Sequence, residues 1–201
     1  MRLDPFYPIV ADADALARLL PTGIRLAQLR VKGRPEAELR HQIARSRDLC
    51  AAHGARLVVN DHWRLALDLG CEAVHLGQED MDDADLPALR RAGVAFGLST
   101  HDEAELDRAL GAAPAYVALG PVWETRLKVM RWGPQGLDRV RAWKARAGAV
   151  PLVGIGGVTV ARLPALFAAG ADSAAVVTDI QAAPDPVARC RAWLAATEAR
   201  R

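Results

Sequence analysis

Acidic and amide side chains follow two short apolar runs in the first half of the chain. Asn60 and Asp61 come directly after the first run, and Gln78, Glu79 and Asp80 come just after the second. The segment between them, WRLALDLG, has apolar residues at helical spacing and stops at a glycine, which predicts a helix between two strands. Parallel strands deliver their carboxyl ends to one edge, so Asp61 and Asp80 can share a divalent cation such as Mg²⁺. Asp61 is also placed to act as an N-cap of the helix, and both interpretations stay open.

Two cationic residues follow an earlier apolar run, with a valine between them. Arg30 and Lys32 alternate with Val31, so both side chains point the same way if the strand continues. A guanidinium binds phosphate oxygens in pairs and an ammonium adds a compact charge, a combination suited to a diphosphate. A solvated strand end is the alternative interpretation.

The segment VGIGGVT, residues 153–159, ends another apolar run with glycines. Gly156 and Gly157 let backbone N–H groups approach an anion, and Thr159 is the expected start of a helix. The next apolar run ends at Thr178 and Asp179, and barrels of alternating strands and helices often hold a phosphate between their last two loops. Glycines that only allow close packing at a strand–helix junction are the alternative.

Eight apolar runs of β type recur along the chain, with helical segments between them. The runs cover residues 6–10, 24–29, 56–60, 73–76, 94–98, 115–119, 150–155 and 173–178, and the expected helices include residues 35–53, 82–92, 102–112, 159–169 and 185–199. This alternation predicts parallel strands joined by helical crossovers. Eight such units predict the α/β class, as a single compact (β/α)8 TIM barrel over residues 1–201. A doubly wound sheet, with about five or six strands, is the alternative.

The active site of a parallel barrel lies where its strands end, which adds further candidates. Gln28 lies in the second run near its end, and Ser99 follows the fifth run. After the sixth run comes GPVWETRLKVMRWGPQ, residues 120–135, the longest stretch without strand or helix character. A loop this long inside a compact domain is usually functional or disordered. Its position and its polar residues, Thr125 and Lys128 among them, favour function.

Histidines and tryptophans also occur near the strand ends. His75 lies between two apolar residues of a predicted strand, which favours a hydrogen-bonded interior position. His62 and His101 begin predicted helices near the site, and no pair of histidines has the spacing of a zinc site. Trp123 and Trp132 in the long loop can stack on a substrate ring or close the loop against the barrel, and we favour the second interpretation.

Composition limits the classes of function. The chain has 201 residues, 51% of them hydrophobic and 25% charged, as expected of one globular domain. Its 26 basic and 24 acidic residues are interspersed, so the net charge of +2 gives no reason to expect a nucleic acid partner. No apolar run approaches the ~18 to 20 residues of a membrane span, and the N-terminal residues lack the pattern of a signal peptide. Cys50, Cys71 and Cys190 form no close pair, which predicts free thiols and a cytoplasmic location.

Six strand-end motifs, taken in order, resemble one family. They are QLRVK at 28–32, VVND at 58–61, VHLGQED at 74–80, GLST at 97–100, LGPVWET at 119–125 with Lys128, and GIGGVT at 154–159 with GADSAAVVTDI at 170–180. Together they resemble thiamine phosphate synthase over nearly the whole chain. That resemblance implies a (β/α)8 barrel that joins hydroxymethylpyrimidine diphosphate to a thiazole phosphate and releases pyrophosphate with Mg²⁺.

The resemblance also implies a role for each matching residue. Arg30, Lys32, Asn60 and Lys128 would hold the diphosphate, Asp61 and Asp80 would bind Mg²⁺, Gln28 and Ser99 would line the pyrimidine, and Thr125, Gly157, Val177 and Thr178 would receive the thiazole phosphate. Arg30, Lys32, Ser99 and Lys128 are the residues expected to carry catalysis. The implied reaction is a dissociative displacement that needs no protein nucleophile. The expected partners are the two small-molecule substrates, with a homo-oligomer as a further option.

One loop departs from the family pattern. The family has P-T-x-T-K where this chain reads ETRLK, so Glu124 replaces the proline and Leu127 the second threonine. The W-E-T wording is similar to the related thiazole tautomerase branch, although that branch is expected to have a histidine where Pro121 stands. A tautomerase of the same fold and a non-catalytic barrel that binds a phosphate ligand are therefore the alternative functions.

Overall fold

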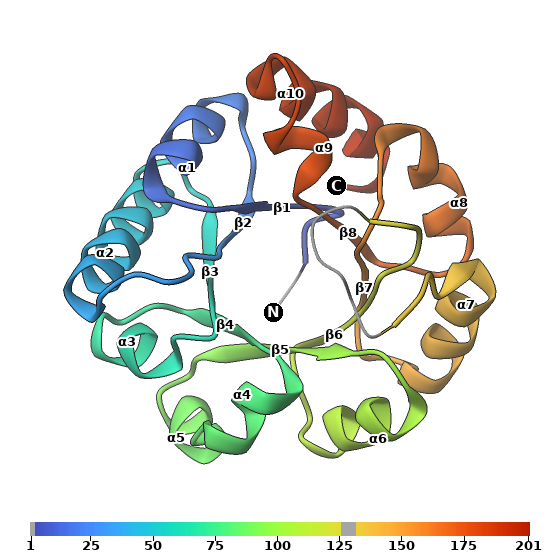
Figure 1. Ribbon diagram of the computed structural model, residues 1–201, viewed down its shortest axis with the longest axis horizontal. Helices are drawn as coiled ribbons and strands as arrows, with labels where there is room; N and C mark the ends of the chain where they lie inside the picture. Colours follow the sequence, from blue (N-terminus) through green and yellow to red (C-terminus); the bar gives the residue numbers. More distant parts are fainter. Residues whose placement is uncertain (1–2, 126–131) are drawn as a thin grey trace.

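Eight parallel strands close into a barrel in the computed structural model, which describes residues 3–125 and 132–201 (Figure 1). Each strand pairs with the next along the chain, and β8 closes the barrel on β1. The strands are β1 (Phe6–Val10), β2 (Leu26–Leu29), β3 (Arg56–Asn60), β4 (Ala73–Leu76), β5 (Ala95–Thr100), β6 (Tyr116–Leu119), β7 (Leu152–Gly154) and β8 (Ser173–Val176). This order confirms the predicted (β/α)8 barrel and contradicts the doubly wound alternative.

Helices surround the barrel on its outside (Figure 1). They are α1 (Ala13–Leu19), α2 (Glu36–Ala52), α3 (Trp63–Asp68), α4 (Gln78–Asp83), α5 (Leu86–Arg91), α6 (Glu103–Gly111), α7 (Gly136–Ala147), α8 (Leu163–Ala168), α9 (Thr178–Gln181) and α10 (Pro186–Thr197), with short 3₁₀ turns η1 (Leu20–Thr22), η2 (Val160–Arg162) and η3 (Glu198–Arg200). Among the described residues, no helix is both long and apolar enough to cross a membrane.

Three predicted element boundaries near the site are wrong in an informative way. The helix expected over residues 82–92 is two helices, because Ala84 has an extended backbone and the Asp85 carboxylate caps α5 by accepting from Ala88 N–H at 2.8 Å. The fifth strand runs on to Thr100, so Ser99 lies within β5. The eighth strand stops at Val176, and Thr178 is the first residue of α9.

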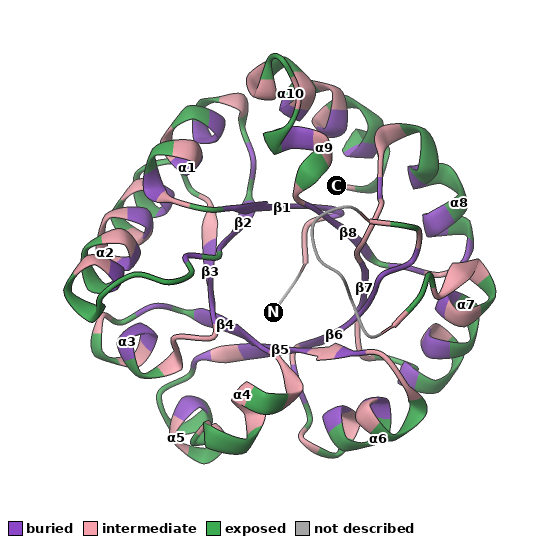
Figure 2. Cartoon of the chain, in the orientation of Figure 1, coloured by how far each residue is buried: buried purple, intermediate pink, exposed green. Residues whose placement is uncertain are grey.

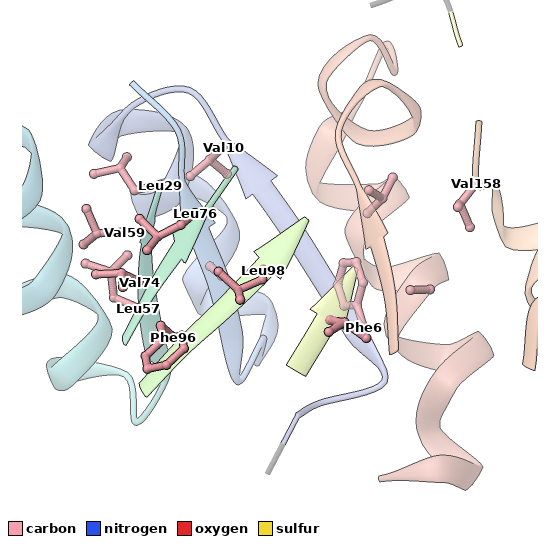
Figure 3. Packing of buried hydrophobic residues seen from close by; sticks show 14 of the residues in the cluster. Phe6, Val10, Leu29, Leu57, Val59, Val74, Leu76, Phe96, Leu98 and Val158 are labelled. Atoms are coloured by element: carbon pink, nitrogen blue, oxygen red, sulfur yellow. The ribbon is translucent and has the colours of Figure 1, made fainter. Parts of the chain in front are cut away.

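The strands carry apolar side chains on both faces, which produces two apolar clusters. In β3, Leu57 and Val59 face the helices, whereas Val58 faces the barrel interior. The outer cluster includes all the residues labelled in Figure 3. It lies beneath the helices, whose inward residues are buried and outward residues exposed (Figure 2). Burying one such Val or Leu contributes roughly 1.5–3 kcal/mol. The two-sided burial explains why these strands read as continuous apolar runs rather than alternating ones.

The inward-facing positions change from apolar to polar along several strands. Side chains two residues apart share a face, and the pairs are Leu26 and Gln28 in β2, Val58 and Asn60 in β3, Ala73 and His75 in β4, and Gly97 and Ser99 in β5. Leu26, Val58 and Ala73 belong to the interior cluster, and the polar members of the four pairs lie nearer the carboxyl ends. The barrel therefore has an apolar interior base and a polar interior end where a ligand would bind.

The three cysteines are buried and free, as predicted. Burial raises the pKa of the Cys50 thiol to about 12 and that of Cys71 to about 11. Because only the thiolate is strongly nucleophilic, these side chains are packing residues of the outer cluster.

Candidate active site

Asp61 and Asp80 lie together beyond the ends of β3 and β4. Asp61 has a left-handed backbone, with φ of 62°, and its N–H donates to the His75 carbonyl at 2.9 Å. Asp80 is the third residue of α4, and its carboxylate accepts from Gly77 N–H at 3.0 Å. Burial and the neighbouring Asp61 carboxylate raise the pKa of Asp80, while the Gly77 N–H and Lys32 act in the opposite direction. Two adjacent carboxylates of this kind form an anionic pair that a cation would stabilise.

The capping alternative for Asp61 is wrong. Helix α3 begins at Trp63 with His62 at the N-cap position, and no side chain caps it. Asp80 is the carboxylate that caps a helix, through its bond to Gly77. Asp61 thus has an unfavourable left-handed backbone conformation, and no helix-capping bond of its side chain explains it. Such backbone strain is common at functional residues.

Lys32 forms an ion pair with Asp61, so the basic and acidic groups meet at the ends of neighbouring strands. The Lys32 side chain is 52% exposed and Asp61 only 15%, which leaves the ammonium open to a second anion. Arg30 is also exposed, whereas Val31 between them is buried. The alternation predicted for these three residues therefore continues beyond the last residue of β2.

The donor set at this edge fits Mg²⁺. Among the residues the structure describes, no group of three or more His, Cys, Asp or Glu side chains could hold a metal ion. Mg²⁺ needs no such cage, because it commonly takes one or two carboxylates and fills its other positions with water and phosphate oxygens. The Asp61–Asp80 pair supplies hard oxygen donors of that number.

A chain of hydrogen bonds crosses the interior of the barrel. Gln28 Nε2 donates to Tyr7 Oη at 2.9 Å, Tyr7 Oη bonds Tyr116 Oη at 2.9 Å, Tyr116 Oη bonds His75 Nδ1 at 2.9 Å, and His75 Nε2 bonds Ser99 Oγ at 2.8 Å. We call these five residues the tyrosine relay. It joins the two residues that the family resemblance assigns to the pyrimidine, Gln28 and Ser99.

His75 occupies the interior, hydrogen-bonded position that was predicted. Burial lowers the pKa of its imidazole to about 4. The Asp61 carboxylate raises this pKa and the Arg30 guanidinium lowers it, both by less than burial does. The ring is therefore neutral at physiological pH, with one nitrogen a donor and the other an acceptor.

The two tyrosines of the relay were missed from sequence. Tyr7 and Tyr116 each lie inside an apolar run, FYPIV and AYVAL, where a buried phenol needs a polar partner. The sequence did offer a signal: each of these two predicted strands carries one tyrosine, and two buried phenols facing the same interior can hydrogen-bond to each other.

Asn60 is 5% exposed at the end of β3, where it pairs with His75 of β4. Gln78, the first residue of α4, donates through Nε2 to the Ser99 carbonyl at 2.7 Å. This bond ties the helix that carries Asp80 to the strand that carries Ser99.

The glycine loop after β7 packs tightly against the loop after β6. A Cβ on Gly156 would lie 2.5 Å from Pro121 Cα, and one on Gly157 would lie 2.5 Å from the Glu124 carbonyl oxygen. Both glycines have positive φ, 93° and 63°. Close packing, the alternative kept open from sequence, is therefore required at both positions. The anion-binding role of Gly157 stays a prediction.

Val177 and Thr178 lie where β8 passes into the short helix α9. Val177 is its N-cap and is half-buried, whereas Thr178 is exposed. The next residue, Asp179, is turned toward α10: Arg189 donates to its carboxylate twice at 2.8 Å, and Trp193 Nε1 donates at 2.7 Å. These bonds neutralise an acid that would otherwise repel an anion beside Thr178.

The long loop after β6 is anchored at both ends. Trp123 N–H donates to the Gly156 carbonyl at 3.1 Å, and Gln135 Nε2 donates to the His101 carbonyl at 3.0 Å. Trp132 stacks on His101, with centroids 5.9 Å apart and an interplanar angle of 6°. The tryptophans thus close the loop against the barrel, as favoured from sequence.

Of the remaining loop candidates, the structure describes Thr125 but not Lys128. Thr125 is half-buried next to Glu124, on the side of the barrel that carries the glycine loop. Lys128 and Leu127, the second departure from the family pattern, lie outside the described residues. His62 and His101 bond to Val31 and Glu105, respectively, and lie at the starts of α3 and α6 as expected.

The fold and the charged groups at the carboxyl ends of the strands define a TIM-barrel enzyme. Comparison with known proteins narrows that class. A family model described as thiamine monophosphate synthase matches residues 7–180. The chain is 60% identical over 197 residues to a thiamine-phosphate synthase of Rhizobium etli, a match that covers 98% of this chain and 97% of that protein. It is 44% identical over 190 residues to one from Neisseria meningitidis serogroup B, which covers 94% and 93% of the two chains.

The chain therefore belongs to the thiamine monophosphate synthase family, and the resemblance noted from its motifs is confirmed. Among solved structures, it is similar to a thiamine phosphate pyrophosphorylase from Pyrococcus furiosus, with a TM-score of 0.84 and 24% identity over 98% of this chain and 96% of that one. At that identity the likeness supports the fold alone.

Proposed function

We propose that this enzyme joins hydroxymethylpyrimidine diphosphate to a thiazole phosphate, giving thiamine phosphate and pyrophosphate. One observation of the site supports this activity best: Lys32, Asp61 and Asp80, from three successive strand ends, meet at one edge of the barrel. A cation beside an anionic pair is the arrangement that a diphosphate and its metal ion require.

The diphosphate would lie at this edge. Arg30 and Lys32 would bind its oxygens, Asn60 would add an amide donor, and Lys128 would reach it from the long loop. Asp61 and Asp80 would hold Mg²⁺, which neutralises charge as the diphosphate leaves. Lys32 forms an ion pair with Asp61 and remains half exposed, so it can bind both the carboxylate and an incoming phosphate oxygen.

The pyrimidine ring would lie over the polar interior positions. Gln28 is buried and Ser99 half-buried, and both side chains are held by hydrogen bonds to neighbours within the barrel. Because neither has to be ordered when the substrate binds, the ring would be oriented at a low entropic cost.

The thiazole phosphate would lie across the barrel, between the loops after β7 and β8. Gly157 and the backbone at Val177 and Thr178 would offer N–H groups, and Thr125 would offer a hydroxyl. The neutralisation of Asp179 by Arg189 supports an anion at this position.

The reaction would need no nucleophile from the protein. The bond between the pyrimidine methylene carbon and the diphosphate oxygen breaks, and its electron pair leaves with pyrophosphate. The thiazole nitrogen then donates its lone pair to the methylene carbon and forms the new C–N bond. The enzyme's residues would stabilise the departing charge and align the two rings, which are the main sources of rate in such displacements.

A pyrophosphate-release assay tests the proposal on the full chain. Release that requires Mg²⁺, the pyrimidine diphosphate and the thiazole phosphate together supports it. Conversion of a thiazole phosphate alone would favour the tautomerase alternative, although Pro121 carries no ionisable group for that chemistry. Tight binding of both substrates without any product would identify a non-catalytic barrel.

A further inference from the structure

The tyrosine relay contains groups that the proposed reaction does not use. Tyr7, Tyr116 and His75 are buried, and each lies between hydrogen-bonding neighbours rather than at the barrel mouth. A fully connected polar network inside an otherwise apolar barrel interior is costly to assemble and is usually retained for a specific purpose. The two ends of the relay are Gln28 and Ser99, so any such purpose acts on those two side chains.

Counting protons gives the relay a direction. Gln28 Nε2 donates to Tyr7 Oη, so the single phenolic proton of Tyr7 is free to reach Tyr116. Tyr116 in turn donates its proton to His75 Nδ1, which must then be the acceptor nitrogen of a neutral imidazole.

The direction continues to Ser99. The imidazole proton lies on Nε2 and is donated to Ser99 Oγ, at 2.8 Å. Ser99 consequently keeps its own hydroxyl proton for an acceptor outside the relay. At the other end, the Gln28 amide that directs Nε2 toward Tyr7 keeps its Oε1 as an acceptor. Reversing the hydrogen-bond polarity at Gln28 or at Ser99 requires every proton of the relay to change partner.

The barrel is built so that the relay can form. Gly97 of β5 pairs with His75 on one side and Tyr116 on the other. A Cβ on Gly97 would lie 2.0 Å from Tyr116 Cζ, so only glycine lets the phenol pass to its partner. The His75 and Tyr116 rings stack over this gap, with centroids 5.6 Å apart and an interplanar angle of 16°.

We propose that Tyr7, Tyr116 and His75 are positioning residues that fix the hydrogen-bond polarity of Gln28 and Ser99, and thereby select an aminopyrimidine over an oxopyrimidine. The inference rests on the proposed function, because it takes Gln28 and Ser99 as the residues that meet the pyrimidine. An aminopyrimidine offers an amine donor and ring nitrogen acceptors, which match the Gln28 oxygen and the Ser99 proton. A 4-oxopyrimidine replaces the amine by an acceptor and places a proton on the adjacent nitrogen.

The specificity follows from this mismatch. An oxopyrimidine would either face the Gln28 oxygen with its own carbonyl oxygen or force the amide to turn. In a free glutamine the amide turns at little cost. Here, turning it requires Tyr7, Tyr116, His75 and Ser99 to exchange donor and acceptor roles together, and any member that does not follow is left as an unpaired buried group. Sites that recognise a substrate through paired buried groups can discriminate by orders of magnitude.

The test compares Tyr7→Phe, Tyr116→Phe and the double variant with the wild-type chain. For each, kcat/KM is measured with the aminopyrimidine diphosphate and with its 4-oxo analogue, and binding of both is measured by calorimetry without the thiazole phosphate. The wild type should prefer the amino compound at least about 100-fold, and each Phe variant should reduce that preference about 10-fold. The double variant should reduce it no further than either single one, because the relay acts as a unit.

Thr100→Val is the matched control. Thr100 is also buried on β5, and its hydroxyl accepts from Trp143 Nε1 at 2.9 Å on the outer side of the strand. This variant loses two buried hydrogen bonds, the one from Trp143 and the one that the Thr100 hydroxyl donates to the Ala118 carbonyl at 3.0 Å, without touching the relay. It should therefore lower stability and leave the amino-to-oxo preference unchanged.

The outcomes separate this inference from the proposed function. A Phe variant that weakens both pyrimidines equally would make the relay a structural network only and overturn the inference. Amino-selective binding that depends on the tyrosines, in a chain that releases no pyrophosphate, would support the relay while the proposed reaction fails. A wild-type chain that binds neither pyrimidine would overturn both.

Discussion

The two sides of the barrel mouth are prepared for anions by different means. At the ends of β2 to β4 the groups are charged side chains, Lys32, Asp61 and Asp80, which already interact with one another. After β7 and β8 the surface is mainly backbone, at Gly156, Gly157 and the start of α9. The first side presents fixed charged side chains. The second side presents backbone, and the neighbouring acid, Asp179, is neutralised by Arg189.

This difference decides what a substitution does on each side. A charged side chain can be replaced with little effect on the packing around it, so its loss should appear mainly in catalysis. A glycine that touches a neighbouring loop cannot be replaced without moving that loop, so its loss should appear in stability and catalysis together.

The largest effect is expected on the charged side. Asp61→Asn and Asp80→Asn should each lower kcat/KM by about 10²- to 10³-fold, since an amide is a poor Mg²⁺ ligand and leaves the departing diphosphate less neutralised. The Mg²⁺ concentration for half-maximal rate should rise in both, and the melting temperature should change little. Kinetics across a Mg²⁺ titration measure this.

Asp68→Asn provides the control, because Asp68 is an exposed acid on α3 paired with Arg40. It should leave the rate and the Mg²⁺ requirement unchanged. Near-normal kinetics in both site variants would mean that the anionic pair serves the fold and not a metal.

The next effect is expected on the backbone side. Gly157→Ala should destabilise the protein by about 1–3 kcal/mol, because a Cβ would meet the Glu124 carbonyl oxygen at 2.5 Å and φ is 63°. The KM for the thiazole phosphate should rise about 10-fold as the loop moves, with a smaller change for the pyrimidine diphosphate. Urea unfolding and substrate titrations separate the two changes.

Gly54→Ala has nearly the same backbone strain, with φ of 64°, and open space around the added methyl group. It should therefore lose about 1 kcal/mol of stability and no activity. Equal behaviour of the two variants would show that the contact with the β6 loop is unimportant.

A pH experiment examines the interior that lies between the two sides. Burial lowers the pKa of His75 to about 4 from an ordinary value near 6.5, so the unfolded chain binds the proton more readily than the folded one. The corresponding stability is fully present above pH ~6.5 and is lost as the pH falls toward 4, amounting to at most about 3 kcal/mol.

His75→Gln should be less stable at pH 7 and should show a shallower loss between pH 6.5 and 4 than the wild type. Urea unfolding at several pH values measures both. His41→Gln, at an exposed position of α2, should reproduce the wild-type slope. An identical slope in the His75 variant would contradict a neutral, buried imidazole.

The smallest effect is expected at the departure from the family pattern. Leu127→Thr restores the second hydroxyl of the family motif and should leave kcat/KM similar or raise it a few-fold, about 2- to 5-fold for one added hydrogen bond of modest net strength. This expectation rests on sequence alone, because residue 127 lies outside the described chain. Loss of activity would show that the loop does not follow the family motif in function.

The strands and the charged side of the site could be read from the sequence because both depend on local order. Each strand is a short apolar run, and Lys32, Asp61 and Asp80 follow the ends of β2, β3 and β4 by three, one and four residues. The pairing of Lys32 with Asp61 then follows from the parallel order of β2 and β3.

What the sequence did not reveal depends on partners distant in the chain. Tyr7 and Tyr116 meet only because β1 and β6 lie across the same interior, and their bond links residues separated by 109 positions. One error was local instead: the helix predicted over residues 82–92 is divided because the Asp85 side chain caps α5, although the apolar pattern continues through that position. The packing role of Gly157 depends on a carbonyl in another loop.

The contact between the glycine loop and the loop after β6 also limits how this barrel can be redesigned. Pro121, Trp123 and Glu124 fit against Gly156 and Gly157, and Arg162 adds a bond to the Gly157 carbonyl and lies over the Trp123 ring. The two loops therefore pack as a single structural unit. A segment transplanted from a related barrel to alter the substrate would have to bring both loops together, since either one alone would be a wrong fit for the other.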